Sequence, residues 1–204
     1  MISRFFTFEE HATLIQGAYH FPLVVLSLSV AVFASFMAFN VAGQASVTHD
    51  ALRRSTLLGT GSIALGGGIW SMHFLGMTAF ELCLPVDYDP LITTLSAIPG
   101  IAAAWVALNL LVKTRISIAE IVLGGVLVGA GIGTMHYSGM AAMEMAPLLR
   151  YDIGMFALSI VVAVGLAMLS LWIKFGITAA IRSRKMLGKH ELLASLVMGL
   201  AISG

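Results

Sequence analysis

The chain has 204 residues, of which 59% are hydrophobic and only 10% are charged, and its mean hydropathy is +0.97. Soluble domains carry about 25% charged residues, so this composition excludes a water-soluble globule. It predicts one all-α, polytopic membrane domain over residues 1–204, with the lipid bilayer as its solvent. The net charge of +1 gives no reason to expect a nucleic-acid partner, and a single cysteine, Cys83, excludes an intrachain disulfide.

Five apolar stretches are long enough to cross a bilayer, which takes about 20 helical residues. A sixth begins near Glu191 and is still apolar at Gly204, so we expect the chain to be a fragment of a longer protein. The five predicted spans are residues 21–41, 55–80, 91–112, 117–143 and 153–175.

Lysine and arginine lie mainly on one side of these spans, and that side is expected to face the cytoplasm. Nine of the eleven cations fall in the connections that follow spans one, three and five, or at the ends of these spans, whereas Arg4 and Arg150 lie on the opposite side. This distribution predicts an N-terminus outside the cell. Spans two, four and six would then run from inside to outside.

The string Met-His-aromatic-x-Gly-Met occurs twice, near the outer ends of spans two and four. The first copy is Met72–Met77 and the second is Met135–Met140, and each follows a glycine that lies six residues before its first methionine. Such an internal repeat indicates a repeated structural unit. Because span six approaches Gly204 with a similar glycine pattern, we expect a third copy just beyond that residue.

The spacing within each copy places an imidazole and a thioether on one helix face. His73 and Met77 are four residues apart, as are His136 and Met140. Thioethers together with imidazoles favour copper, particularly Cu(I), and neutral ligands are easier to place in a membrane than carboxylates. The sequence therefore predicts a copper site with the candidate ligands His73, His136, Met72, Met77, Met135 and Met140.

The two histidines are expected at the same depth, roughly 26–29 Å from the inner edge of the membrane. A histidine in a span can simply hydrogen-bond a neighbouring helix. Two copies at matched depth instead favour a ligand-binding role. On span four, Gly125, Gly129 and Gly133 form a ladder that would let another helix approach closely, either within the chain or in a homodimer.

The two strings resemble the signature of the MHYT domain family of bacterial integral-membrane sensors, and the resemblance covers essentially the whole chain. Phe74, Leu75 and Ser138 stand where the family signature has tyrosine and threonine, but each Met and His is intact. The resemblance implies seven spans, three motifs near the outer face and a copper site built from motif residues. It also implies sensing of oxygen, carbon monoxide or nitric oxide, and fusion to a cytoplasmic module such as a cyclic-di-GMP enzyme or a histidine kinase.

We therefore interpret the chain as the sensory input domain of a bacterial signalling protein in the cell (inner) membrane. Its expected partners are a diatomic gas or a redox signal and a cytoplasmic output module. No hydrolase triad, phosphate loop or catalytic carboxylate pair occurs in the spans, so the sequence predicts no enzyme in this segment. Two alternatives stay open: a haem held between His73 and His136, and a metal transporter, although the spans have few polar residues at mid-membrane.

Overall fold

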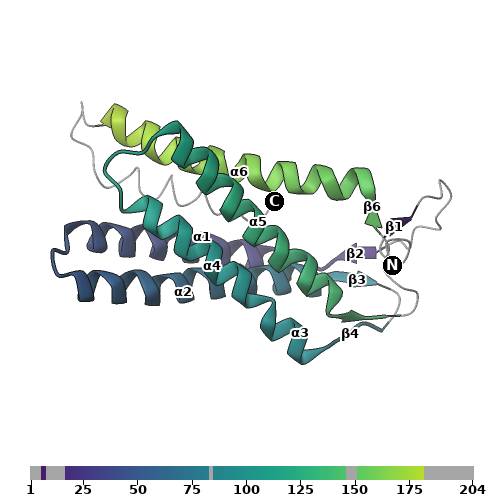
Figure 1. Ribbon diagram of the computed structural model, residues 1–204. Coiled ribbons are helices and arrows are strands. Elements are labelled where there is room, and N and C mark those ends of the chain that lie inside the picture. The colour runs from purple at the N-terminus through teal and green to yellow at the C-terminus, as the bar shows by residue number, and fades with distance from the viewer. Residues whose placement is uncertain (1–5, 8–16, 83–84, 146–150, 182–204) are drawn as a thin grey trace.

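The computed structural model describes residues 6–7, 17–82, 85–145 and 151–181. Within these residues the protein is an elongated bundle of helices with three short two-stranded ladders at one end (Figure 1). The predicted all-α membrane architecture is confirmed. The helices are α1 (Phe21–Val47), α2 (Ala51–Thr78), α3 (Pro90–Leu95), α4 (Ala97–Leu111), α5 (Ile118–Ala141) and α6 (Ile153–Ile181).

The ladders join segments that precede and follow the helices. Strands β2 and β3 pair antiparallel, as do β4 and β5, whereas β1 and β6 pair parallel. The bounds are β1 (Phe6–Thr7), β2 (Gly17–Tyr19), β3 (Phe80–Leu82), β4 (Asp87–Tyr88), β5 (Met143–Glu144) and β6 (Tyr151–Asp152).

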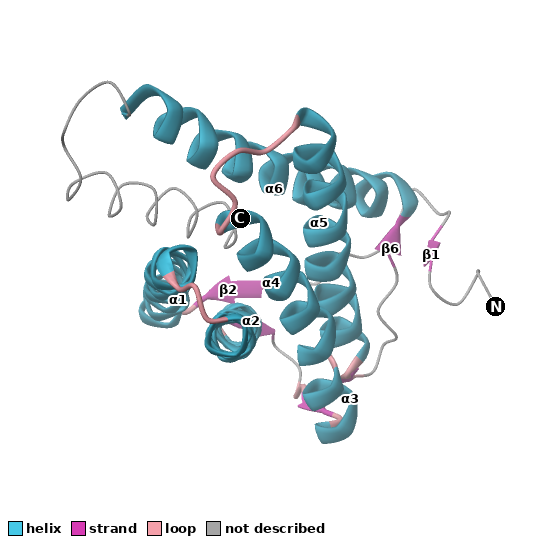
Figure 2. Ribbon diagram, turned by 60° about the vertical axis from the view of Figure 1, so that its left-hand side comes forward, coloured by secondary structure: helices cyan, strands magenta, loops and turns pink. Residues whose placement is uncertain are grey.

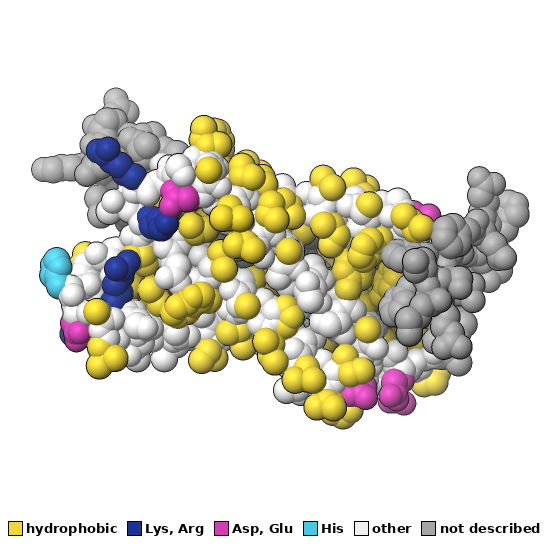
Figure 3. Space-filling view, in the orientation of Figure 1, with side chains coloured by type: hydrophobic (Ala, Val, Ile, Leu, Met, Phe, Trp, Pro, Cys, Tyr) yellow, Lys and Arg dark blue, Asp and Glu magenta, His cyan; other side chains and the backbone are white. Residues whose placement is uncertain are grey.

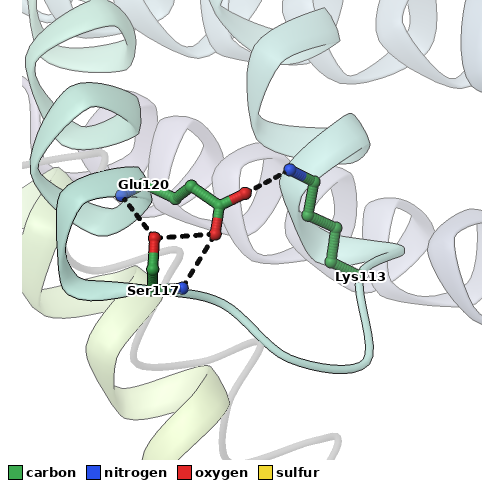
Figure 4. A network of polar contacts seen from close by, with 3 residues as sticks. All are labelled: Lys113, Ser117 and Glu120. Atoms are coloured by element: carbon green, nitrogen blue, oxygen red, sulfur yellow. Dashed lines mark hydrogen bonds and ion pairs between the residues drawn. The ribbon is translucent and has the colours of Figure 1, made fainter.

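Side-chain caps fix where α2, α3 and α5 begin. The carboxylates of Asp50 and Asp89 accept hydrogen bonds from the first backbone N–H groups of α2 and α3. At α5, Ser117 and Glu120 form a reciprocal capping box, and Lys113 from the end of α4 makes an ion pair with Glu120 (Figure 4). This network joins the ends of α4 and α5. Because the ion pair is exposed to solvent, it contributes little to stability.

Each helix packs mainly against one or two neighbours, in the order α1, α2, α4, α5, α6 (Figure 2). Helices α2 and α5 both pack along α4 and touch each other little. Helix α1 presents small side chains to the bundle, including Ala31, Ala34, Ala38 and Ala42. Helix α6 is the least enclosed, with few buried residues in its membrane-spanning part. Among its described side chains, Leu171 is buried.

The predicted glycine ladder of α5 is a close-packing surface, and its neighbour is α6 of the same chain. A Cβ added at Gly125 would lie 2.2 Å from Met168 Cγ, and one at Gly129 would lie 2.7 Å from Val164 Cα. The ladder is therefore occupied within the chain, so it supplies no argument for a homodimer, which stays a prediction.

The α1–α2 and α4–α5 hairpins are built alike, so the sequence repeat is also a structural repeat. In each hairpin the motif-bearing helix ends at a fully buried alanine, Ala79 or Ala142. The carbonyl oxygen of that alanine accepts a hydrogen bond from the residue before the partner helix. The donors are His20 N–H and Asp89 N–H, both at 2.8 Å. A short antiparallel ladder then extends each pair.

Predicted span three is broken into α3 and α4 at Ser96, which the sequence reading did not anticipate. Pro99 lies four residues after Leu95 and has no N–H to donate to the Leu95 carbonyl oxygen, so the regular helix is interrupted there. The Trp70 indole of α2 donates to the Thr93 carbonyl and the Ser96 hydroxyl, both at 3.0 Å. This contact ties the break to the helix that carries the first motif.

Four helical stretches of the described residues are long and apolar enough to cross a membrane: 21–47, 90–111, 118–141 and 153–175. Helix α2 is long enough, with 28 residues, but its glycine, serine, threonine and arginine residues make it less apolar. It is therefore not one of these four stretches. Five described spans therefore stay a prediction. The predicted sixth, which begins near Glu191, lies outside the described residues. Figure 3 shows Lys and Arg side chains gathered at the end where α1 joins α2 and α4 joins α5, and the orientation of that end in the membrane stays a prediction.

Candidate metal and ligand site

His73 of α2 and His136 of α5 meet near the C-terminal ends of their helices. Their ring centroids are 4.8 Å apart, and the ring planes are inclined by 58°. Each histidine lies within the last two turns of its helix, so the prediction that the two lie at one level is confirmed. Because α2 and α5 otherwise make few contacts with each other, this pair is a principal junction between them.

The Nε2 atom of His73 is buried and has no hydrogen-bond partner. A buried polar atom without a partner costs free energy, so its presence needs an explanation. The absence of a side chain at Gly139 lets the ring lie close to α5, since a Cβ there would be 3.3 Å from that nitrogen. The unpaired nitrogen thus faces α5 at Gly139, at the junction of the two motif helices.

The four candidate methionine ligands fall into two environments. Met77 and Met140 are half-buried and line the same cavity as the histidines. Met72 and Met135 also border this cavity but are buried in the core, at 6% and 1% exposure. Ser27 on α1 donates to the Met72 carbonyl, and the Met135 sulfur packs beside Gly100 of α4. Packing thus accounts for Met72 and Met135 without a ligand role.

No group of three or more His, Cys, Asp or Glu side chains that could hold a metal ion occurs among the described residues. Any metal bound at the histidine pair would therefore need thioethers or small-molecule ligands to complete its coordination. Thioethers from Met77 and Met140 are the donors that the chain offers on the same helix faces. Met143, one turn beyond Met140 in the predicted span, lies in strand β5 because α5 ends at Ala141.

Aromatic rings surround the histidine pair on both sides. Phe74 packs edge-on against His73 with centroids 5.6 Å apart, and Tyr137 packs against His136 with centroids 4.9 Å apart. Phe74 also contacts Tyr88 of β4, and Tyr137 contacts Tyr151 of β6. The site is thus a set of rings that begins in the helices and continues into the outer ladders.

The two strand tyrosines are neutral hydrogen-bonding groups at physiological pH. Burial and the neighbouring Tyr137 raise the pKa of Tyr151 to about 12. Burial also raises the pKa of Tyr88. Both phenols therefore keep their protons near the site.

A cavity of about 890 Å³ opens beside the histidines and continues between the helices. Its outer part is bordered by His73, His136, Tyr88 and Tyr137, and its inner part by small and aliphatic side chains of α4 and α6. Ligand cavities of roughly 300–1,000 Å³ with apolar walls and a few polar groups are typical of small-molecule sites.

Several residues of this site were not singled out from the sequence. Tyr88 of β4 lies between two predicted spans, in a segment of the sequence that carries no motif. Ser27 and Trp70 contribute through contacts with helices far away in the sequence, whereas Gly139 belongs to the repeated string and only its contact with His73 was not predicted. Such contacts leave no local periodic signal.

Ser27 supports the first motif helix directly, so its replacement should loosen that helix. Its hydroxyl donates to the Met72 carbonyl at 2.6 Å and is buried. Ser27→Ala is expected to lower stability by about 1 kcal/mol. Ser29→Ala is the control, because Ser29 is exposed and bonds only the Val25 carbonyl of its own helix. Thermal unfolding of the two purified variants tests this prediction. Equal unfolding midpoints would contradict a stabilising role for the Ser27 hydrogen bond.

The repeated motif, its hairpins and the apolar helices define a multi-pass helical membrane domain. Residues 66–124 and 129–189 match the MHYT family, described as a bacterial signalling protein N-terminal repeat. The chain belongs to this family, and each matched copy includes one of the two Met-His motifs.

Curated relatives include larger signalling proteins. The chain is 40% identical over 188 residues to the bifunctional diguanylate cyclase/cyclic di-GMP phosphodiesterase MucR of Pseudomonas aeruginosa, a match over 92% of the chain and 27% of MucR. It is 30% identical to the signaling protein YkoW of Bacillus subtilis, over 93% of the chain and 23% of YkoW. It is 34% identical to the cyclic di-GMP phosphodiesterase NbdA of P. aeruginosa, over 73% of the chain and 19% of NbdA. The chain thus spans about a quarter of the length of the first two. No solved structure matches it.

Proposed function

We propose that the chain is the sensory input domain of a bacterial signalling protein and that it holds copper between His73 and His136. The carrying observation is the convergence of the two imidazole rings, 4.8 Å apart, beside a cavity that Met77 and Met140 also line. The domain would lie in the inner membrane with its N-terminus outside, as the distribution of Lys and Arg supports.

The spacing of the two rings suits a shared metal ion. An imidazole nitrogen binds a first-row metal at about 2 Å, so two imidazoles on one tetrahedral ion have centroids roughly 5 Å apart. The thioethers of Met77 and Met140 would add soft donors, which favour Cu(I) over harder ions. His73 Nε2, buried without a partner, is a nitrogen that a metal would satisfy.

Copper in this site would supply a centre that binds a diatomic gas or changes oxidation state. The chain's own residues would hold the ion at the junction of α2 and α5 and surround it with aromatic rings. Apolar walls would admit oxygen, carbon monoxide or nitric oxide from the lipid phase, where such gases are more soluble than ions. Phe74 and Tyr137 lie against the two histidines and limit what can reach them.

The output would be a cytoplasmic module of the same polypeptide. MucR and NbdA, as named, make or degrade cyclic di-GMP, and this supports a module of that kind. Cyclic-di-GMP synthesis or breakdown would then belong to the fused module and the sensing to this segment.

Metal analysis of the purified protein tests the copper proposal. We expect copper in the parent protein and its loss in a His73→Ala, His136→Ala double variant. A His20→Ala, His49→Ala double variant is the matched control, because both of those histidines are exposed. Copper retained equally in both double variants would refute the proposal.

The haem alternative is less well supported by the geometry. An iron with axial imidazoles on opposite faces requires the macrocycle between the two rings. The rings of His73 and His136 instead lie 4.8 Å apart, so haem binding would require α2 and α5 to separate. A visible-range spectrum of the protein used for metal analysis distinguishes the two cofactors.

A further inference from the structure

The cavity is much larger than a metal ion or a diatomic gas requires. Its volume is about 890 Å³, and its lining extends from the histidines near the outer ends of α2 and α5 to Leu111 at the last residue of α4. This extent points to an elongated occupant that lies along the helices. Such an occupant would come from the membrane, since the inner part of the lining is apolar.

The two ends of the cavity differ in chemistry. The outer end has imidazole and phenol groups, from His73, His136, Tyr88 and Tyr137. The inner part is lined by small or aliphatic side chains, among them Ala103 and Ala107 of α4 and Ala163 and Ala167 of α6. An occupant that matches both ends has a polar, hydrogen-bonding head and an apolar chain.

Charge narrows the class of head group. The described lining residues include no lysine or arginine, and their one carboxylate is that of Glu81, which is exposed in β3. An anionic head, such as a phosphate or a fatty-acid carboxylate, would have no cation to pair with and would be costly to bury. The head group is therefore neutral.

The polar groups at the outer end favour a flat head with hydrogen-bond acceptors. A neutral imidazole has one N–H donor, and the Tyr88 phenol has one O–H donor, whereas the Tyr137 hydroxyl already bonds Ser159. The aromatic rings of Tyr88 and Tyr137 line this end of the cavity and suit a planar ring. A plain hydrocarbon chain would leave the unpaired nitrogen of His73 unsatisfied.

We propose that the cavity binds a neutral, lipid-soluble quinone, with its carbonyl-bearing ring beside the His73–His136 pair and its chain between α4 and α6. A quinone carbonyl accepts the hydrogen bonds that imidazole and phenol donors offer, and its chain matches the alanine-lined inner part. Binding requires no metal, but the quinone ring would lie at the same histidine pair as the copper ion of the proposed function, so quinone binding is measured both with copper bound and with copper chelated. It would let the domain respond to the quinone content of the membrane.

Titration of the intact protein in lipid nanodiscs with decylubiquinone tests the proposal. Quenching of tryptophan fluorescence, corrected with empty nanodiscs, should saturate at one quinone per chain, since Trp70 packs against Phe74 beside the site. Ala167→Phe places a ring in the inner part of the cavity and should weaken binding by at least about tenfold. Ala157→Phe is the matched control on α6, because Ala157 is exposed and does not line the cavity, and its affinity should not change.

Each outcome bears on the proposal. Unsaturable quenching in the intact protein, with copper bound and with copper chelated, would overturn it and indicate that acyl chains or another protein segment fill the cavity. Equal weakening by both phenylalanine variants would overturn it as well. Ala163→Phe, one turn away on α6, serves in place of Ala167→Phe if that variant does not fold. Copper content should be the same in all of these variants, so failure of this proposal is separable from failure of the copper site.

Discussion

Replacing Gly66 with alanine is expected to destabilise the bundle, whereas the same change at the adjacent Gly67 is expected to be neutral or stabilising. A Cβ at Gly66 would lie 2.5 Å from the Ile101 Cα and 2.7 Å from its backbone nitrogen, so α2 and α4 would have to move apart. Overpacking of this kind costs about 1–3 kcal/mol. At Gly67 no atom lies within 4 Å of the added Cβ, and alanine favours the helix by up to about 1 kcal/mol.

The comparison is decisive because both glycines lie in the same turn of α2. Thermal unfolding of the detergent-solubilised proteins should give a lower midpoint for Gly66→Ala and an unchanged or higher one for Gly67→Ala. Copper content should fall in Gly66→Ala as well, since displacement of α2 moves His73. A midpoint for Gly66→Ala at or above that of the parent would show that the α2–α4 approach is not as close as described.

Replacing Met77 and Met140 together with leucine is expected to remove most of the Cu(I) affinity without unfolding the protein. Exchange of methionine for leucine nearly conserves volume, so the change removes thioethers more than packing. The Cu(I) affinity should fall by more than about 100-fold, because even residues that only orient a metal ligand change metal affinity by about 10–100-fold. Met72→Leu with Met135→Leu is the control pair, since these side chains are buried in the core.

Competition with a colorimetric Cu(I) chelator measures both pairs under the same conditions. We expect the Met72→Leu, Met135→Leu double variant to bind Cu(I) as tightly as the parent protein. The Met77→Leu, Met140→Leu double variant should bind Cu(I) far more weakly. Equal losses in the two pairs would mean that all the motif methionines act alike. Loss only in the Met72/Met135 pair would reverse the assignment of ligand and packing roles.

Much of the fold was predictable, because hydropathy and glycine spacing are local signals. The α1, α5 and α6 helices cover the predicted spans 21–41, 117–143 and 153–175 to within a few residues at most boundaries. The break at Ser96 was not anticipated, although Pro99 in the sequence permitted it. The ladders at the outer end join residues far apart in the chain, such as Tyr19 and Phe80, and no periodic pattern marks two- or three-residue strands.

The histidine pair was predictable because the repeat placed both copies at equivalent helix ends. The division of the methionines into cavity-lining and core residues was not, since Met72 and Met77 look alike in the sequence. The two methionines differ in the residues they contact. Met72 contacts Ser27 of α1, and this contact depends on how α1 and α2 pack against each other. The copper ligands themselves stay a prediction, as do the bound gas and the homodimer.

Helix α4 lies between the two motif helices along most of their length, yet the histidines meet beyond its reach. An ion or ligand held by both rings would therefore link α2 directly to α5. Elsewhere the two helices are joined mainly through α4. At the opposite end of the bundle, Lys113, Ser117 and Glu120 join α4 to α5. A ligand at the histidine pair would therefore change how α2 and α5 are joined at one end of the bundle without touching the link between α4 and α5 at the other.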